Sequence, residues 1–155
     1  GYGFTMIQVL LLLRLIMAKN TMKLLMKLKG IIIMLDEKDI FDKGILAFNE
    51  KRFYDAHEYW EDLWVNHKLK DAKFIQGLIQ LAVSYFHLFN QNLNGARSMI
   101  RKSVGKFDSF DMARGINVLD LIDDIKRVNE HINNIDKASC FNDDYIILLK
   151  VIDDK

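Results

Sequence analysis

The sequence predicts an all-α protein, a compact bundle of five to six helices built from two packed helix-turn-helix hairpins plus C-terminal helices. The first observation behind this prediction is that none of the 155 residues is proline, the residue that most strongly interrupts a helix. The second is that apolar residues recur at spacings of three and four, whereas the strict alternation typical of strands is scarce. The third is the composition, because 50% hydrophobic and 28% charged residues are typical of a globular domain rather than a disordered chain.

The apolar spacing predicts five helices and a short sixth, and it predicts no sheet. These helices cover 36–49, 53–67, 72–90, 95–107 and 118–134, with the short one following Asn142. Acidic and amide side chains stand at or just before several of the starts, where they can accept hydrogen bonds from the free backbone N–H groups of the first turn. The candidate caps are Asp36, Asp71, Asn94, Asn117 and Asn142.

Residues 1–33 are predicted to be a basic, apolar extension to a single all-helical domain of residues 34–155. The extension carries five basic side chains and no acidic one, and its apolar run Met6–Ala18 is shorter than the roughly 20 residues that a membrane-spanning helix needs. Lys29-Gly30 would be encoded by a purine-rich stretch just upstream of the Met34 codon, as in a bacterial ribosome-binding site. One hypothesis is therefore that the extension is not part of the native protein. The alternative is a helix that associates with a membrane surface or packs against protein.

Charge and cysteine content exclude several kinds of partner. Outside the extension, 17 basic and 21 acidic side chains give a net charge of −4, so the domain lacks the basic face that nucleic acid requires. We expect no membrane contact for residues 34–155. Cys140 is the only cysteine, which excludes an internal disulfide and indicates a reducing, cytoplasmic location. The partners left open are a second copy of the chain in a homo-oligomer and an unidentified small molecule.

The helix predicted over 53–67 carries two polar side chains inside a broad aromatic arc. On a helical wheel, His57 and Glu61 fall between the aromatic residues of this arc, which we expect to face the core. They stand four residues apart in the sequence and can therefore contact each other. Glu58 lies at the rim of the arc. The indole rings expected to wall the polar pair are those of Trp60 and Trp64.

The helix predicted over 72–90 is apolar on most sides, which places it at the centre of the bundle. Its one polar arc holds glutamines and a histidine instead of the lysines and glutamates that a solvent-exposed arc attracts. Because the two helices form an antiparallel hairpin, we expect this arc to face the imidazole and carboxylate of the preceding helix. These side chains form a buried set that we call the polar seam: His57, Glu61, Gln76, Gln80 and His87.

The first interpretation of the polar seam is a structural network or a pocket for a small ligand. A buried network fixes the register of packed helices when every polar group has a partner, whereas a pocket presents the same groups to a ligand. Two arginines on the helix over 95–107, Arg97 and Arg101, can neutralise Glu58 or Glu61. The residues expected to bind are His57, Trp60, Trp64, Gln76, Gln80, His87 and Arg101.

The second interpretation is a metal-dependent hydrolase with a divalent metal as its cofactor. His57, Glu61 and His87 offer nitrogen and oxygen ligands from facing helices, as in the metal sites of helical bundles. A metal-bound water would then attack the substrate, with Glu58 or Glu61 as the catalytic carboxylate. The helix carries His-Glu-x-x-Glu, which departs from the His-Glu-x-x-His motif of zinc proteases.

The third interpretation is a tetratricopeptide-like interaction module. Phe48-Asn49 and Phe89-Asn90 each mark a helix-turn-helix elbow, and such hairpins are the unit of that repeat. A concave, exposed aromatic groove would favour this interpretation.

The strings FNEKRFYDAHEYWEDLW, FIQGLIQLAVSYFH and NLNGA resemble the motifs of the domain-of-unknown-function family 309. The resemblance covers about residues 38–107 and leaves residues 1–33 outside. It implies a compact all-helical bundle and assigns no established activity, although some members are labelled as metal-dependent hydrolases. The matching residues are Phe48, Asn49, Ala56, His57, Glu58, Glu61, Trp64, Gln76, Gly77, Leu78, Ile79, Gln80, His87, Asn92, Gly95 and Ala96.

Overall fold

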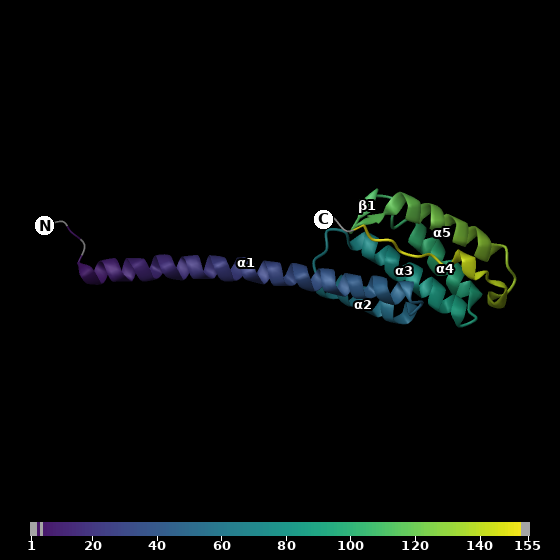
Figure 1. Ribbon diagram of the computed structural model, residues 1–155, viewed down its shortest axis with the longest axis horizontal. Coiled ribbons are helices and arrows are strands. Elements are labelled where there is room, and N and C mark those ends of the chain that lie inside the picture. Colours follow the sequence, from purple (N-terminus) through teal and green to yellow (C-terminus); the bar gives the residue numbers. More distant parts are fainter. Residues whose placement is uncertain (1–2, 4, 153–155) are drawn as a thin grey trace. The chain divides into compact units, whose positions relative to one another are not determined.

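The computed structural model describes residues 3 and 5–152 and confirms the predicted all-α class. The described α-helices are α1 (Met6–Asn49), α2 (Phe53–Asn66), α3 (Ala72–Phe89), α4 (Leu93–Val104) and α5 (Val118–Asn133). The chain divides into two compact units, residues 1–38 and residues 39–155. In the second unit, α3 and α4 lie between α2 and α5 (Figure 1).

The first unit contains the N-terminal part of α1. Every leucine, isoleucine, valine and methionine from residue 6 to residue 35 is exposed. None of the described helices is both long enough and apolar enough to cross a membrane.

The predicted start of a helix at Asp36 is wrong, because α1 begins at Met6 and continues through this residue to Asn49. Aspartate caps a helix only where the preceding residues leave the helical conformation. Most residues before Asp36 are leucine, methionine and lysine, which favour a helix, and no proline interrupts them. A single glycine, Gly30, weakens a helix by only about 1 kcal/mol without ending it.

The central helices follow the prediction closely. α2, α3 and α5 begin at the predicted residues and end one residue earlier. α4 begins at Leu93 instead of residue 95, because the side chain of Asn92 caps it by accepting a hydrogen bond from the Gly95 amide at 2.9 Å. The predicted cap, Asn94, lies within the first turn. The side chain of Asn117 caps α5 as predicted, accepting from the Asp120 amide at 3.1 Å.

Short elements replace the predicted loop and last helix. A two-residue strand pair, β1 (Met112–Ala113) and β2 (Ile116–Asn117), runs antiparallel and corrects the expectation of no sheet. Its turn residues, Arg114 and Gly115, both have positive φ angles, as a two-residue hairpin turn of type I′ requires. The last predicted helix is a 3₁₀ turn, Asp143–Tyr145, and a second 3₁₀ turn covers Ala138–Cys140.

The segment after Tyr145 is extended and lies along the bundle, held by two polar side chains. The Tyr85 hydroxyl donates to the Tyr145 carbonyl at 2.8 Å and accepts from the Ile147 amide at 2.9 Å. The side chain of Asn49 bonds both backbone groups of Leu149, at 2.8 and 2.9 Å. Burial raises the pKa of Tyr85 well above its ordinary value, because a phenolate in this position would lose its hydration.

An aromatic cluster at the junction of α1 and α2 forms part of the core. Trp60 is completely buried between Phe41 and Phe48, and its indole N–H donates to the Phe41 carbonyl at 3.3 Å. The ring fits because the facing residue of α1 is Gly44, where a Cβ atom would collide with the indole. This close approach fixes α2 against the end of α1, and α2 in turn positions the polar residues on its other side.

Candidate functional site

The centre of the candidate site is an imidazole–carboxylate pair on α2. The Nε2 atom of His57 lies 3.1 Å from a carboxylate oxygen of Glu61, the contact predicted from their spacing. The His57 side chain is 20% exposed, whereas that of Glu61 is 54% exposed. The pair therefore lies at the surface of the bundle, with the imidazole ring largely buried and the carboxylate in contact with solvent.

Two further residues of α2 extend the site toward α3. The Tyr54 ring lies 5.6 Å from the His57 ring and 5.4 Å from the Phe86 ring of α3, measured between centroids. The Glu58 carboxylate accepts a hydrogen bond from the Tyr54 hydroxyl, and this bond, together with the negative charges of Glu58 and Glu61, raises the pKa of Tyr54. Negative charge favours the neutral phenol over the phenolate, and the two carboxylates themselves make the charge near this hydroxyl negative.

The register of α2 against α3 places Gln80 of the seam at about the same level as this pair, and no described contact joins it to His57 or Glu61. The helices are antiparallel, and the contact of Tyr54 with Phe86 fixes which residues are level. Moving along both helices at the same rise brings Gln80 level with the turn that holds Glu61, about one helical turn from His57. The three polar side chains thus lie within one short stretch of the hairpin.

Two side-chain atoms of the seam are buried without a partner. Among the residues that the structure describes, these are Nδ1 of His57 and Oε1 of Gln80. A neutral imidazole whose Nε2–H donates to Glu61 presents Nδ1 as an acceptor, and the carboxamide oxygen is an acceptor in every state. Nearly all buried polar atoms in proteins have hydrogen-bond partners. These two acceptors are exceptions, because no described side chain or backbone group donates to either of them.

The seam is less buried than the sequence analysis predicts. Glu61 and Trp64 are exposed, the latter at 42%, whereas Trp60 is at 0%. The prediction treated the whole aromatic arc as facing the core, but α2 buries only a narrower stripe, because only part of its circumference meets α1 and α3. The buried residues of α2 are Phe53, Ala56, Trp60 and Leu63. Trp60 therefore belongs to the core, and Trp64 alone of the two indoles faces solvent.

The structure does not bring the three predicted metal ligands together. His87 lies at the elbow between α3 and α4, with its Nδ1 atom 3.4 Å from the Asn92 side-chain nitrogen. Within residues 3 and 5–152, no three His, Cys, Asp or Glu side chains are placed to hold a metal ion. The hydrolase with His57, Glu61 and His87 as ligands thus gains no support from the geometry.

The remaining predicted residues lie at the margin of the seam. Gln76 is half-buried on α3, and Arg101 is exposed on α4. Among the described contacts, no ion pair joins Arg101 to Glu58 or Glu61. The neighbouring Arg97 instead donates to the backbone carbonyls at the end of α5, including that of Ile132 at 2.9 Å. The carboxylates of α2 are therefore not neutralised from α4.

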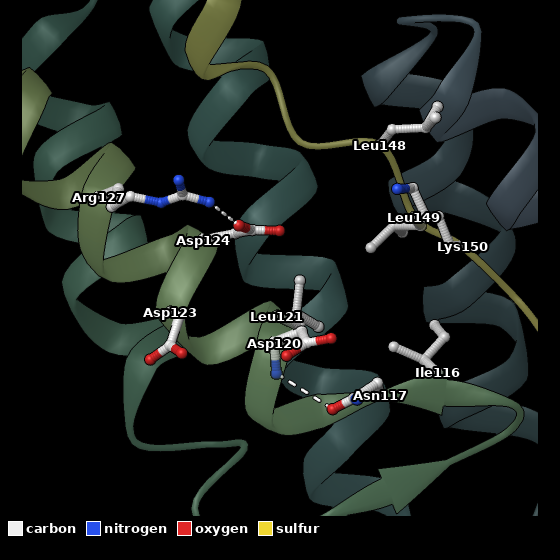
Figure 2. A pocket seen from close by; sticks show the side chains of 10 residues that line it. All are labelled: Ile116, Asn117, Asp120, Leu121, Asp123, Asp124, Arg127, Leu148, Leu149 and Lys150. Atoms are coloured by element: carbon white, nitrogen blue, oxygen red, sulfur yellow. Dashed lines mark hydrogen bonds and ion pairs between the residues drawn. The ribbon is translucent and has the colours of Figure 1, made fainter.

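A groove that the sequence analysis missed runs between α5 and the extended C-terminal segment (Figure 2). Its volume is about 620 Å³, and it is lined by Ile116, Asn117, Asp120, Leu121, Asp123, Asp124, Arg127, Leu148, Leu149 and Lys150. Asp124 pairs with Arg127, and the Asn117 side chain caps α5. These polar groups serve the helix that carries them, so the groove has a structural explanation. No sequence signal marks it, because its two walls are brought together only by the fold.

Comparison with known families identifies the part of the chain that carries the seam. Residues 41–99 match the sequence model of a domain of unknown function, DUF309. This segment is similar to the DUF309 family. The match confirms the resemblance noted in the sequence, and the DUF309 segment contains all of α2 and α3, and therefore the whole polar seam. No curated protein matches the chain at a significant level.

Proposed function

We propose that the DUF309 segment of this chain binds a small cationic amine at the polar seam, with the ammonium group between α2 and α3. The observation that supports this most is the pair of buried acceptors, Nδ1 of His57 and Oε1 of Gln80, one on each helix. An alkylammonium group carries three N–H donors, so it can donate to both acceptors. The Glu61 carboxylate, which lies on the Nε2 side of the His57 ring, adds negative charge at the exposed end of the seam.

The charge of the two helices also favours a cation. α2 contains Asp55, Glu58, Glu61 and Asp62 and no lysine or arginine, and the one such residue on α3 is Lys73. The carboxylates of Glu58 and Glu61 are not paired with arginine in the described part of the chain, and they raise the pKa of Tyr54. An approaching cation is attracted by this potential, whereas a carboxylate ligand is repelled.

Aromatic side chains border the exposed end of the seam. Tyr54 is 50% exposed and Trp64 is 42% exposed. Rings at the edge of a site stabilise a desolvating cation through their π faces, by about 0.5–2 kcal/mol each. Access to the buried acceptors requires rotation of side chains at this edge, a change that is common when ligands bind.

The test is a binding titration with simple probes and the full chain. Butylammonium and phenethylammonium are titrated against the protein while NMR follows the side-chain amide of Gln80 and the imidazole of His57. Butyrate and hydrocinnamate, of similar size and opposite charge, serve as the comparison. We expect the amines to shift both signals and the carboxylates to leave them unchanged.

Variants locate the binding on the seam. Glu61→Gln and Gln80→Leu are each expected to weaken amine binding at least tenfold, which corresponds to about 1.4 kcal/mol. Glu130→Gln removes an exposed carboxylate from α5 and should leave the affinity unchanged. Equal affinity for amines and carboxylates, or no binding of any probe, would refute the proposed function.

A further inference from the structure

The N-terminal part of α1 exposes more apolar surface than a soluble helix can leave bare. Every leucine, isoleucine, valine and methionine from residue 6 to residue 35 is exposed, with exposed fractions from 39% to 74%. The hydrophobic effect disfavours such a surface in water by about 25 cal/mol for each Å². Large exposed apolar patches are typical of surfaces that contact other molecules.

The charge of the same segment is of one sign. Residues 6–35 contain Arg14, Lys19, Lys23, Lys27 and Lys29 and no acidic residue. Lys19, Lys23 and Lys27 follow each other at every fourth position and therefore form one stripe on the helix.

The apolar residues opposite this lysine stripe form a second stripe. At 100° per residue they centre about 160° away from the lysine stripe. Lys29 falls outside the lysine stripe and Met26, Ile33 and Met34 fall on its side of the helix, so the two faces are only partly separated. The residues of this apolar stripe are Leu25, Leu28, Ile32 and Leu35. The first half, Met6–Ala18, is apolar on nearly all sides apart from Gln8 and Arg14.

We propose that residues 6–35 bind the surface of a membrane that carries anionic lipids. The apolar stripe and the apolar first half would enter the boundary between headgroups and acyl chains, while the lysine stripe contacts lipid phosphates. Exposed leucine and isoleucine together with a stripe of lysines are typical of helices that bind anionic membrane surfaces, although in α1 the apolar residues also occur outside the apolar stripe. The helix is not long and apolar enough to cross a bilayer, which is consistent with a surface position.

Charge favours lipid over a second copy of the chain. Helices that pair in coiled coils place opposite charges along their seam, but residues 6–35 have no acidic residue to offer a partner copy. Two such helices side by side would bring ten positive charges together. An anionic bilayer instead neutralises each lysine, with about 1 kcal/mol of attraction per basic residue near its surface.

The test is co-sedimentation of the full chain with vesicles. We expect binding to vesicles of phosphatidylcholine with phosphatidylserine, weaker binding to phosphatidylcholine alone, and loss of the difference at high salt. Replacing Lys19, Lys23 and Lys27 with glutamine should weaken binding about 100-fold, from about 1 kcal/mol per lysine. The matched control replaces three exposed lysines of the second unit, Lys68, Lys102 and Lys126, and should bind like the unchanged protein.

Other results would overturn the proposal. Equal binding to both kinds of vesicle would show that the lysines do not act through lipid charge. A stable oligomer that forms without lipid and does not bind vesicles would show that the apolar surface contacts a second copy of the chain. Mass spectrometry of natively expressed protein that finds no peptide from residues 6–33 would also overturn it. None of these outcomes involves amine binding at the polar seam, so the two proposals fail separately.

Discussion

Replacing Gln80 with leucine should stabilise the protein, and this prediction tests the polar seam directly. In the structure, Oε1 of Gln80 is buried and has no hydrogen-bond partner. An unpaired buried carbonyl costs about 1–3 kcal/mol relative to a hydrated one. Leucine has a similar size, removes this group and adds apolar surface to a half-buried position. We expect the free energy of unfolding to rise by about 1 kcal/mol, the lower limit, because the side chain is only partly enclosed.

Urea unfolding followed by circular dichroism gives the free energy, and thermal melting gives an independent value. A gain of about 1 kcal/mol corresponds to a rise in Tm of roughly 4 °C for a unit of this size. Gln76→Leu is the matched control, since Gln76 is also a half-buried glutamine of α3 but has no buried unpaired atom in the described structure. It should change stability by less than about 0.5 kcal/mol. A loss of stability in Gln80→Leu would refute the reasoning, because it would mean that the carbonyl makes a bond that holds the hairpin.

Three further substitutions test other parts of the structure by unfolding experiments. Tyr85→Phe leaves the buried Ile147 amide without its acceptor and should cost about 1–3 kcal/mol. Burial raises the pKa of Tyr85 in the folded state, so its contribution to the free energy of unfolding is complete below the unfolded pKa of about 10 and is lost as the pH rises toward the folded pKa. The phenylalanine variant should lack this alkaline decline in stability. An identical decline in both proteins would contradict the assignment. Glu61→Ala should cost less than about 1 kcal/mol, since the carboxylate is exposed, and a larger loss would show that it anchors the hairpin. Gly44→Ala should cost about 1–3 kcal/mol by forcing a Cβ atom against Trp60, and unchanged stability would disprove this close approach.

The helix interiors were predictable because their signals are local. Apolar spacing indicates α2, α3 and α5, and the predictions match the starts of these helices. Of these three, only α5 has a side-chain cap, that of Asn117, whereas the predicted cap of α3, Asp71, makes no capping hydrogen bond. The start of α4 shows the limit of this reasoning. Asn92 and Asn94 can both cap a helix, and the choice of Asn92 depends on its contact with the Gly95 amide, which composition does not reveal.

The C-terminal segment was mispredicted because its conformation depends on residues far away in the sequence. Residues 145–149 are a run of five apolar side chains, which fits a buried helix turn as well as an extended segment. The extended form is selected by side-chain partners for its backbone, Asn49 and Tyr85. These partners come from α1 and α3, so a prediction limited to neighbouring residues had no access to them.

The predicted depth of the seam residues differs from the structure, and the reason bears on the proposed function. A helical wheel gives the direction of a side chain, whereas its depth depends on how many neighbours cover that direction. α2 has neighbours only over the stripe that contains Ala56 and Trp60, so His57 stands at the edge of the core and Glu61 lies outside it. A network that serves only to fix helix register would be satisfied within the protein, whereas here the inner atoms, His57 Nδ1 and Gln80 Oε1, lack donors and the outer carboxylate meets solvent. An exposed carboxylate beside buried acceptors that have no donor favours a binding site for a ligand that donates hydrogen bonds over a purely structural network.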